Sequence, residues 1–113
     1  MEDCIFCKLA NGVIPTNIVY EDEYVTAFND LNPQAPVHIL VVPKKHYENV
    51  LSVNYDDTII SKIYSAINKI AAKQGFDKEG FRVITNCGEN AGQTVMHMHF
   101  HILAGKKLGE HII

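Results

Sequence analysis

The chain has 113 residues, of which 47% are hydrophobic and 20% are charged. These fractions are ordinary for a globular protein and exclude a disordered or fibrous one, and the length leaves room for one core. We therefore predict a single domain over residues 1–113. Because 13 Asp and Glu outnumber 10 Lys and Arg, the net charge of −3 provides no basic surface for nucleic acid, which we exclude as a main partner.

The sequence predicts neither a membrane segment nor a secretory signal. No apolar run approaches the ~20 residues that span a bilayer, and the start is acidic, with Glu2 and Asp3, where a signal peptide is basic. We expect a cytoplasmic protein with no membrane partner, and a nuclear location is compatible with the same features. In such a compartment the three cysteines, two of them spaced as Cys4-x-x-Cys7, are expected to be thiols or metal ligands.

The first half of the chain predicts a short helix, a hairpin and a buried strand. Apolar residues at helical spacing predict a helix over residues 5–10, which Asn11-Gly12 ends. Two β-rich stretches, 17–21 and 24–29, flank a polar pair and predict a hairpin. After a loop with two prolines at 30–36, the apolar run at 38–42 predicts a central strand that is buried on both faces.

The second half predicts one long helix and two strands. Isoleucines recur at three- and four-residue steps from about residue 57 to 74, and Gly75 follows, which is typical of an amphipathic helix and its end. Strands are predicted at 81–85 and 95–103, joined by a polar loop at 86–94. The predicted fold class is therefore α+β, an antiparallel sheet with one long helix and a short N-terminal helix.

The densest chemical signal is the run His97-Met98-His99-Phe100-His101, which holds three of the six histidines. On a strand, the three imidazoles would share one face while the apolar residues between them pack on the other. Burying three neighbouring imidazoles without a use for them would cost about 1–3 kcal/mol for each unsatisfied group, which favours a functional site. A neutral imidazole at His99 can act as a nucleophile or as a general base.

The polar loop before these histidines contains Gly88 and Gly92. Such glycines often only make turns, but they also permit positive φ, and successive N–H groups in that conformation bind anions. Beside three histidines, the loop predicts a phosphate cradle. Thr94 adds a hydroxyl group that can lie near a leaving group.

The run from Gly92 to Leu103 resembles the signature of the histidine-triad (HIT) nucleotide-binding family, in which three histidines alternate with apolar residues. Similarity to its purine nucleoside phosphoramidase (Hint) branch extends over nearly the whole chain. The resemblance implies an antiparallel sheet meander that continues across the two-fold axis of a homodimer. It also implies a hydrolase without an organic cofactor, which cleaves AMP from an amine or another leaving group through a nucleotidyl-histidine intermediate.

The same resemblance implies catalytic roles for His99, His101, His38 and Thr94. His99 would attack the α-phosphorus, and His101 would stabilise charge on the phosphate oxygens. His38, at the start of the central strand, would orient His99 or relay a proton. Thr94 stands where the family more often has Ser, so the hydroxyl group is kept.

The resemblance also implies a nucleotide site. Asp30 would hold the ribose hydroxyls, although on the residues alone it fits a turn-capping role as well. Leu9 and Ile14 match the pocket for the base and fit an ordinary core equally well. The implied nucleotide-binding residues are Ile5, Phe6, Phe28, Asp30, Leu31, Asn86, Gly92, Thr94, His99 and His101.

Cys4 and Cys7 supply half of a tetrahedral zinc site, which two histidines elsewhere would complete. The resemblance implies that these are His46 and His97, in a structural site. If zinc holds His97, that residue cannot move protons, so the chemistry would rest on the other two histidines of the run. The alternatives are two reduced thiols in a short helix, or a redox disulfide, which lacks its usual setting after a strand.

Two other functions stay open from the sequence. In a metallohydrolase, His97, His99 and His101 would together bind a catalytic metal, and chelators would stop the activity. In the alternative without catalysis, the chain would be a purine-nucleotide-binding module that contacts protein partners. The C-terminal tail departs from the common pattern of the family and contains no Trp, which leaves the preference for a leaving group open.

Overall fold

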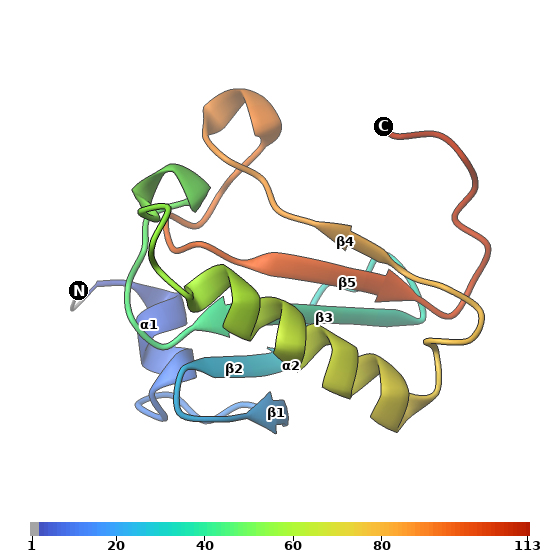
Figure 1. Cartoon of the computed structure of the whole chain (residues 1–113), viewed down its shortest axis with the longest axis horizontal. Helices are drawn as coiled ribbons and strands as arrows, with labels where there is room; N and C mark the ends of the chain where they lie inside the picture. Colours follow the sequence, from blue (N-terminus) through green and yellow to red (C-terminus); the bar gives the residue numbers. More distant parts are fainter. Residues whose placement is uncertain (1–2) are drawn as a thin grey trace.

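The computed structural model describes residues 3–113 and consists of a five-stranded antiparallel sheet with a helix on each face (Figure 1). Met1 and Glu2, which belong to the acidic start, lie outside the described residues. In spatial order the strands are β1 (Ile18–Glu21), β2 (Val25–Asn29), β3 (Val37–Pro43), β5 (Phe100–Ala104) and β4 (Arg82–Ile84). The predicted α+β class, the hairpin of β1 and β2, and the central place of the 38–42 strand are confirmed.

The sheet is covered on both faces because β3 is apolar on both faces. Ile39 and Val41 pack in the larger core, together with the long helix α2 (Ile59–Gln74). Leu40 and Val42 point to the other face and pack in a smaller core with the short helix α1 (Ile5–Ala10). A strand with this continuous apolar run can only lie between two layers, as its sequence predicted.

Helix α2 begins two residues later than the predicted start at 57. Asp57 lies just outside the helix, where its carboxylate accepts the N–H of Ile59 at 2.9 Å, a common arrangement at a helix start. The helix ends at Gly75, whose φ of 84° is left-handed, as the sequence predicted. The isoleucines at three- and four-residue spacing are buried against the sheet.

The predicted strand at 95–103 is paired only from Phe100 onward, so its first half is wrong. Residues 95–97 bend away from the sheet, and the N–H of Met98 donates to the carbonyl of Tyr47 at 2.6 Å in place of a ladder bond. The alternation of side chains continues through this segment. Met98, Phe100 and Ile102 enter the α2 core, and the histidines between them lie on the α1 side.

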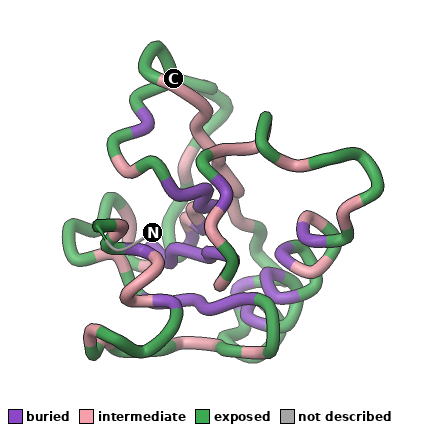
Figure 2. The backbone as a smooth tube through the Cα atoms, turned by 90° about the vertical axis from the view of Figure 1, so that its left-hand side faces the viewer, coloured by how far each residue is buried: buried purple, intermediate pink, exposed green. Residues whose placement is uncertain are grey.

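Burial follows these layers. Figure 2 shows that the buried segments lie in the middle of the molecule and the exposed ones in the outer loops.

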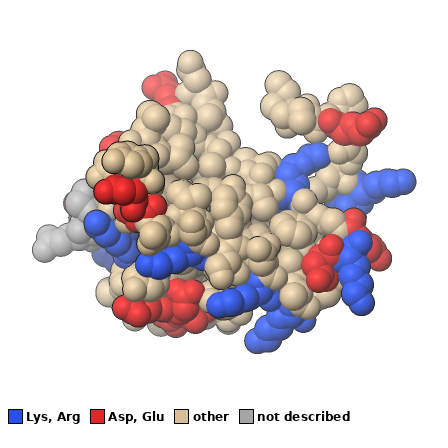
Figure 3. Space-filling view, in the orientation of Figure 1, with Lys and Arg blue, Asp and Glu red and all other residues tan. Residues whose placement is uncertain are grey.

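On the face in Figure 3, acidic and basic side chains are intermingled along the lower part. Within residues 3–113, no helix combines the length and the apolar character that crossing a membrane requires. The histidines of the run lie on the α1 side of the sheet.

Candidate active site

A cavity of about 790 Å³ lies between α1, β2 and the segment that leads to the histidines. Its volume is in the range of small-molecule sites. All six apolar residues that were predicted to surround the base line it: Ile5, Phe6, Leu9, Ile14, Phe28 and Leu31. Asp30, Thr94 and His99 line it as well. The structure therefore brings together residues that were predicted to contact the base, the ribose and the phosphate.

Three polar residues of the cavity wall were missed by the sequence analysis. Thr16, Asn17 and Asn29 line it beside the predicted groups. Thr16 and Asn17 follow Ile14-Pro15 in the loop before β1, and Asn29 is the last residue of β2. The only available signal was their closeness in sequence to the predicted residues Ile14 and Asp30.

His99 is buried, and both its ring and its backbone are held by hydrogen bonds. Its ring Nδ1 is 2.8 Å from the carbonyl oxygen of His97, which can only accept, so in the neutral ring Nδ1 carries the proton and Nε2 keeps the lone pair. The hydroxyl of Thr85 donates to the carbonyl of His99 at 2.8 Å. Phe6 packs edge-on against the ring, with 5.0 Å between centroids. The result is an imidazole with a fixed orientation in the wall of the cavity.

His101 is paired with His38. The backbone N–H of Gln34 donates to Nδ1 of His38 at 3.0 Å, so the proton of His38 is on Nε2, which donates to Nδ1 of His101 at 2.9 Å. Burial, followed by the nearby His99 and His38, lowers the pKa of His101 to about 4, so its ring is neutral and carries its proton on Nε2. The sequence analysis gave His38 a role toward His99, whereas the structure places it against His101.

The glycine loop differs from the predicted cradle. Gly88 and Gly92 do have left-handed φ values of 85° and 83°. However, the N–H of Gly88 donates to Oε1 of Gln93 at 2.9 Å, and the N–H of Gly92 to the carbonyl of Glu89 at 3.0 Å, so these donors are used inside the loop. Of the residues that the resemblance placed at the phosphate, Thr94 and His99 line the cavity, whereas Asn86, Gly92 and His101 do not.

Gln93 closes this loop, a role that the sequence analysis did not assign. It is buried, and its Nε2 donates to the carbonyls of Glu48 at 2.7 Å and Val95 at 3.0 Å. Together with the bond from Gly88, the side chain thus ties the loop to the segment after β3. This fixes the backbone on both sides of Thr94.

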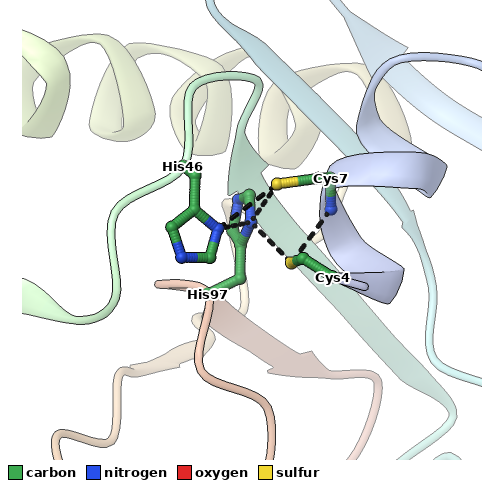
Figure 4. Close-up of side chains that lie close together, drawn as sticks. All are labelled: Cys4, Cys7, His46 and His97. Carbon is green, nitrogen blue, oxygen red and sulfur yellow. Dashed lines mark hydrogen bonds between the residues drawn. The ribbon is translucent and has the colours of Figure 1, made fainter. Parts of the chain in front are cut away.

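The four predicted metal ligands converge beside α1 (Figure 4). Nδ1 of His97 is 3.2–3.4 Å from Cys4 Sγ, Cys7 Sγ and His46 Nδ1, and Cys7 Sγ is 3.3 Å from His46 Nδ1. All four atoms lie within 4.8 Å of one another. A tetrahedral zinc with bonds of about 2.0 Å to nitrogen and 2.3 Å to sulfur holds its ligand atoms about 3.3–3.8 Å apart. The spacing and the donor set therefore fit zinc, and the three cysteines are free thiols.

The tautomer of His97 also fits a metal ligand. Its Nε2 donates to the carbonyl of Pro43 at 2.8 Å, which leaves Nδ1 unprotonated and directed at the cysteines. Burial, followed by the nearby His46 and His99, lowers the pKa of His97 to about 4, although the bond to Pro43 opposes this. The ring is therefore neutral at neutral pH, as a metal ligand must be.

Comparison with known proteins agrees with this geometry. Residues 11–108 match the model of the HIT domain. The chain belongs to the HIT domain family. The purine nucleoside phosphoramidase of Escherichia coli K12 is 39% identical over 109 residues, which are 96% of this chain and 92% of that protein. An uncharacterised HIT-like protein of Rickettsia prowazekii is 45% identical over 111 residues, 92% of this chain and 88% of the other.

Solved structures of HIT proteins have the same fold. A histidine triad protein from Clostridium difficile has a TM-score of 0.96 at 60% identity. The match covers 98% of this chain and 97% of that protein. A HIT family hydrolase from Clostridium thermocellum has a TM-score of 0.96 at 46% identity, with coverage of 100% and 99%. The predicted family and the predicted α+β meander are thereby confirmed.

In this HIT protein the three histidines of the run have different partners. His97 belongs to the group with the cysteines, and His101 lies with His38 and Asp30. Among residues 3–113, no group of potential metal ligands unites the three histidines, and His99 is in neither of the two groups found. The arrangement that a three-histidine metallohydrolase requires is not formed in the described part of the chain.

Proposed function

We propose that this HIT protein is a hydrolase that cleaves AMP, or a related purine nucleoside 5′-monophosphate, from an amine or another leaving group. The observation that carries the proposal is His99, which lines the cavity and whose Nδ1 is held by a backbone carbonyl, so that Nε2 is the ring nitrogen left for a ligand. The relatives named a purine nucleoside phosphoramidase and a HIT family hydrolase support it.

The reaction proceeds in two substitutions at phosphorus. Nε2 of His99 donates its lone pair to the α-phosphorus, the bond from phosphorus to the leaving nitrogen breaks, and that nitrogen takes a proton from solvent. Water then attacks the same phosphorus, gives a proton back to solvent, breaks the bond to His99 and releases AMP, which restores the free imidazole. Covalent catalysis of this kind replaces one difficult step by two easier ones.

Two neighbours of His99, His101 and Thr94, stabilise the negative charge of the phosphate. The ring of His101 lies next to it, with 5.2 Å between centroids, and its Nε2–H donates to a non-bridging phosphate oxygen. The hydroxyl of Thr94, which lines the cavity, donates to the phosphate or to the leaving group. Positioning and charge stabilisation of this sort carry most of the catalysis in phosphoryl transfer.

The rest of the cavity binds the nucleoside. The apolar side chains of α1 and β2, Phe6 and Phe28 among them, pack against the base. Asp30, which is partly exposed in the wall, accepts hydrogen bonds from the ribose hydroxyls. The lining of the cavity thus offers side chains to the base, the ribose and the phosphate of AMP.

We also infer that Cys4, Cys7, His46 and His97 hold a structural zinc ion. When bound, zinc ties α1 to the segment that leads into β5, and it provides no step of the reaction. The homodimer that the resemblance implies is part of the same proposal, and the mass of the protein in solution tests it.

The decisive experiment traps the intermediate. Protein that is quenched during turnover of an adenosine 5′-phosphoramidate is expected to gain the mass of one AMP, and peptide mapping is expected to place it on His99. The variant His99→Ala is expected to bind AMP and to release none from the substrate. An adduct on another residue, or turnover by His99→Ala, contradicts the mechanism, and AMP binding without turnover by the wild type would favour the non-catalytic binding module.

A further inference from the structure

One N–H group of His38 faces two acceptors at the edge of the cavity. Nε2 of His38 is 2.9 Å from Nδ1 of His101 and 3.4 Å from Oδ2 of Asp30. Because the N–H of Gln34 occupies Nδ1 of His38, the neutral ring has a single proton, and this proton is on Nε2. The carboxylate of Asp30 and the imidazole of His101 therefore compete for one hydrogen.

Of Asp30, His38 and His101, only Asp30 lines the cavity. Asp30 lines the cavity with 21% of its side chain exposed, whereas the side chain of His38 is 5% exposed and does not line it. The other carboxylate oxygen of Asp30 accepts the N–H of Asn32 at 2.8 Å, which fixes the orientation of the group. His38 therefore connects Asp30, in the wall of the cavity, to His101, whose ring lies beside that of His99.

The charge of Asp30 acts on His101 as well. Burial, followed by His99 and His38, lowers the pKa of His101 to about 4, and the carboxylate of Asp30 opposes that shift. A change in the hydrogen bonding of Asp30 therefore reaches His101 both through His38 and directly through the field of the carboxylate.

We propose that Asp30 and His38 make the rate of turnover, and not only the binding of substrate, depend on the ribose hydroxyls. The inference rests on the proposed hydrolase function. The N–H of His38 lies closer to His101, at 2.9 Å, than to Asp30, at 3.4 Å, and a ribose hydroxyl that donates to Oδ2 of Asp30 weakens the competing acceptor and strengthens the bond to His101. His101 is thereby held in the tautomer and orientation that direct its Nε2–H at the phosphate. The substrates selected in this way are ribonucleotide conjugates with a free 2′,3′-diol.

The test separates kcat from KM for adenosine 5′-phosphoramidate and its 2′,3′-dideoxy analogue. With the wild type, loss of the hydroxyls is expected to lower kcat about tenfold, the scale of one good hydrogen bond, in addition to raising KM. In His38→Ala, which keeps Asp30, the two substrates are expected to have equal kcat while KM still differs. His38→Gln, whose side-chain amide can donate to His101, is expected to restore part of the difference.

Two further variants complete the experiment. Asp30→Asn can still accept the N–H of Asn32 and is expected to lose the kcat difference, so the test does not depend on His38→Ala folding well. His111→Ala, at an exposed histidine of the tail, is expected to keep the wild-type ratio. The inference is overturned if the dideoxy analogue changes only KM in the wild type, or if the kcat ratio persists in His38→Ala and Asp30→Asn. A wild type that turns over neither substrate overturns the proposed function itself.

Discussion

Phe6 lines the cavity and packs against both His99 and His97. Its ring centroid is 5.0 Å from that of His99, 5.8 Å from that of Phe28 and 6.1 Å from that of His97, each in an edge-on arrangement. The side chain is 8% exposed and belongs to the smaller core, on the α1 side of the sheet. We therefore predict that Phe6→Ala impairs both the stability and the nucleotide site.

The chain provides a matched control in Phe76. It is also 8% exposed and also has an edge-on aromatic neighbour, Phe81 at 5.4 Å, but it lies in the α2 core. Truncation of a buried Phe to Ala costs about 3–5 kcal/mol. At roughly 4 °C for each kcal/mol in a domain of this size, both Phe6→Ala and Phe76→Ala are expected to lower Tm by about 12–20 °C.

Only the Phe6 variant is expected to bind AMP more weakly. One aromatic contact contributes about 0.5–1.5 kcal/mol, so the loss of the ring that borders the base corresponds to about two- to tenfold in Kd. Calorimetric titration with AMP at a temperature well below both transitions measures this, and urea unfolding measures stability. Equal weakening in Phe76→Ala would show that general destabilisation is the cause, and unchanged affinity in Phe6→Ala would remove Phe6 from the wall that contacts the base.

Three further changes test other parts of the structure. Since burial lowers the pKa of His101 to about 4 from its usual 6.5, the unfolded chain binds a proton that the folded one does not, and urea titrations should show stability falling from pH 6.5 to 4, less so in His101→Asn. Zinc at 100 times its Kd should add about 2.7 kcal/mol to stability in the wild type and in Cys87→Ser, but not in Cys7→Ser. Gln93→Leu removes three part-buried hydrogen bonds, and at about 0.5–1.5 kcal/mol for each it should lose about 1.5–4.5 kcal/mol in urea unfolding; a loss below that range would contradict the role given to Gln93.

The parts of the fold that the sequence predicts are those whose signal is local. The run at 38–42 is apolar at every position except His38, so only a strand between two layers can bury it, and the structure has β3 there. In α2, the isoleucine spacing and Gly75 define a face and an end without reference to the rest of the chain. Both patterns would have the same meaning in another protein.

The first half of the predicted 95–103 strand was wrong for a non-local reason. Alternating side chains show that a chain is extended, but not that a neighbouring strand pairs with it. Before Phe100 the partner of the backbone is Tyr47, in the segment after β3, and Gln93 holds the loop to Glu48 in the same region. These contacts join residues more than forty positions apart, and no pattern within the segment announces them.

The difference between local and non-local signals also explains why three alternating histidines have three different hydrogen-bond partners. Alternation places them on one side of the chain, and it says nothing about which nitrogen of each ring is available. That is decided by the acceptor or donor at the other nitrogen, which is the carbonyl of Pro43 for His97, the carbonyl of His97 for His99, and Nε2 of His38 for His101. The first leaves Nδ1 free for a metal, the second leaves Nε2 free as a nucleophile, and the third makes Nε2 a donor. Because two of these three partners lie on β3, the chemistry of the histidine run depends as much on that strand as on the run itself.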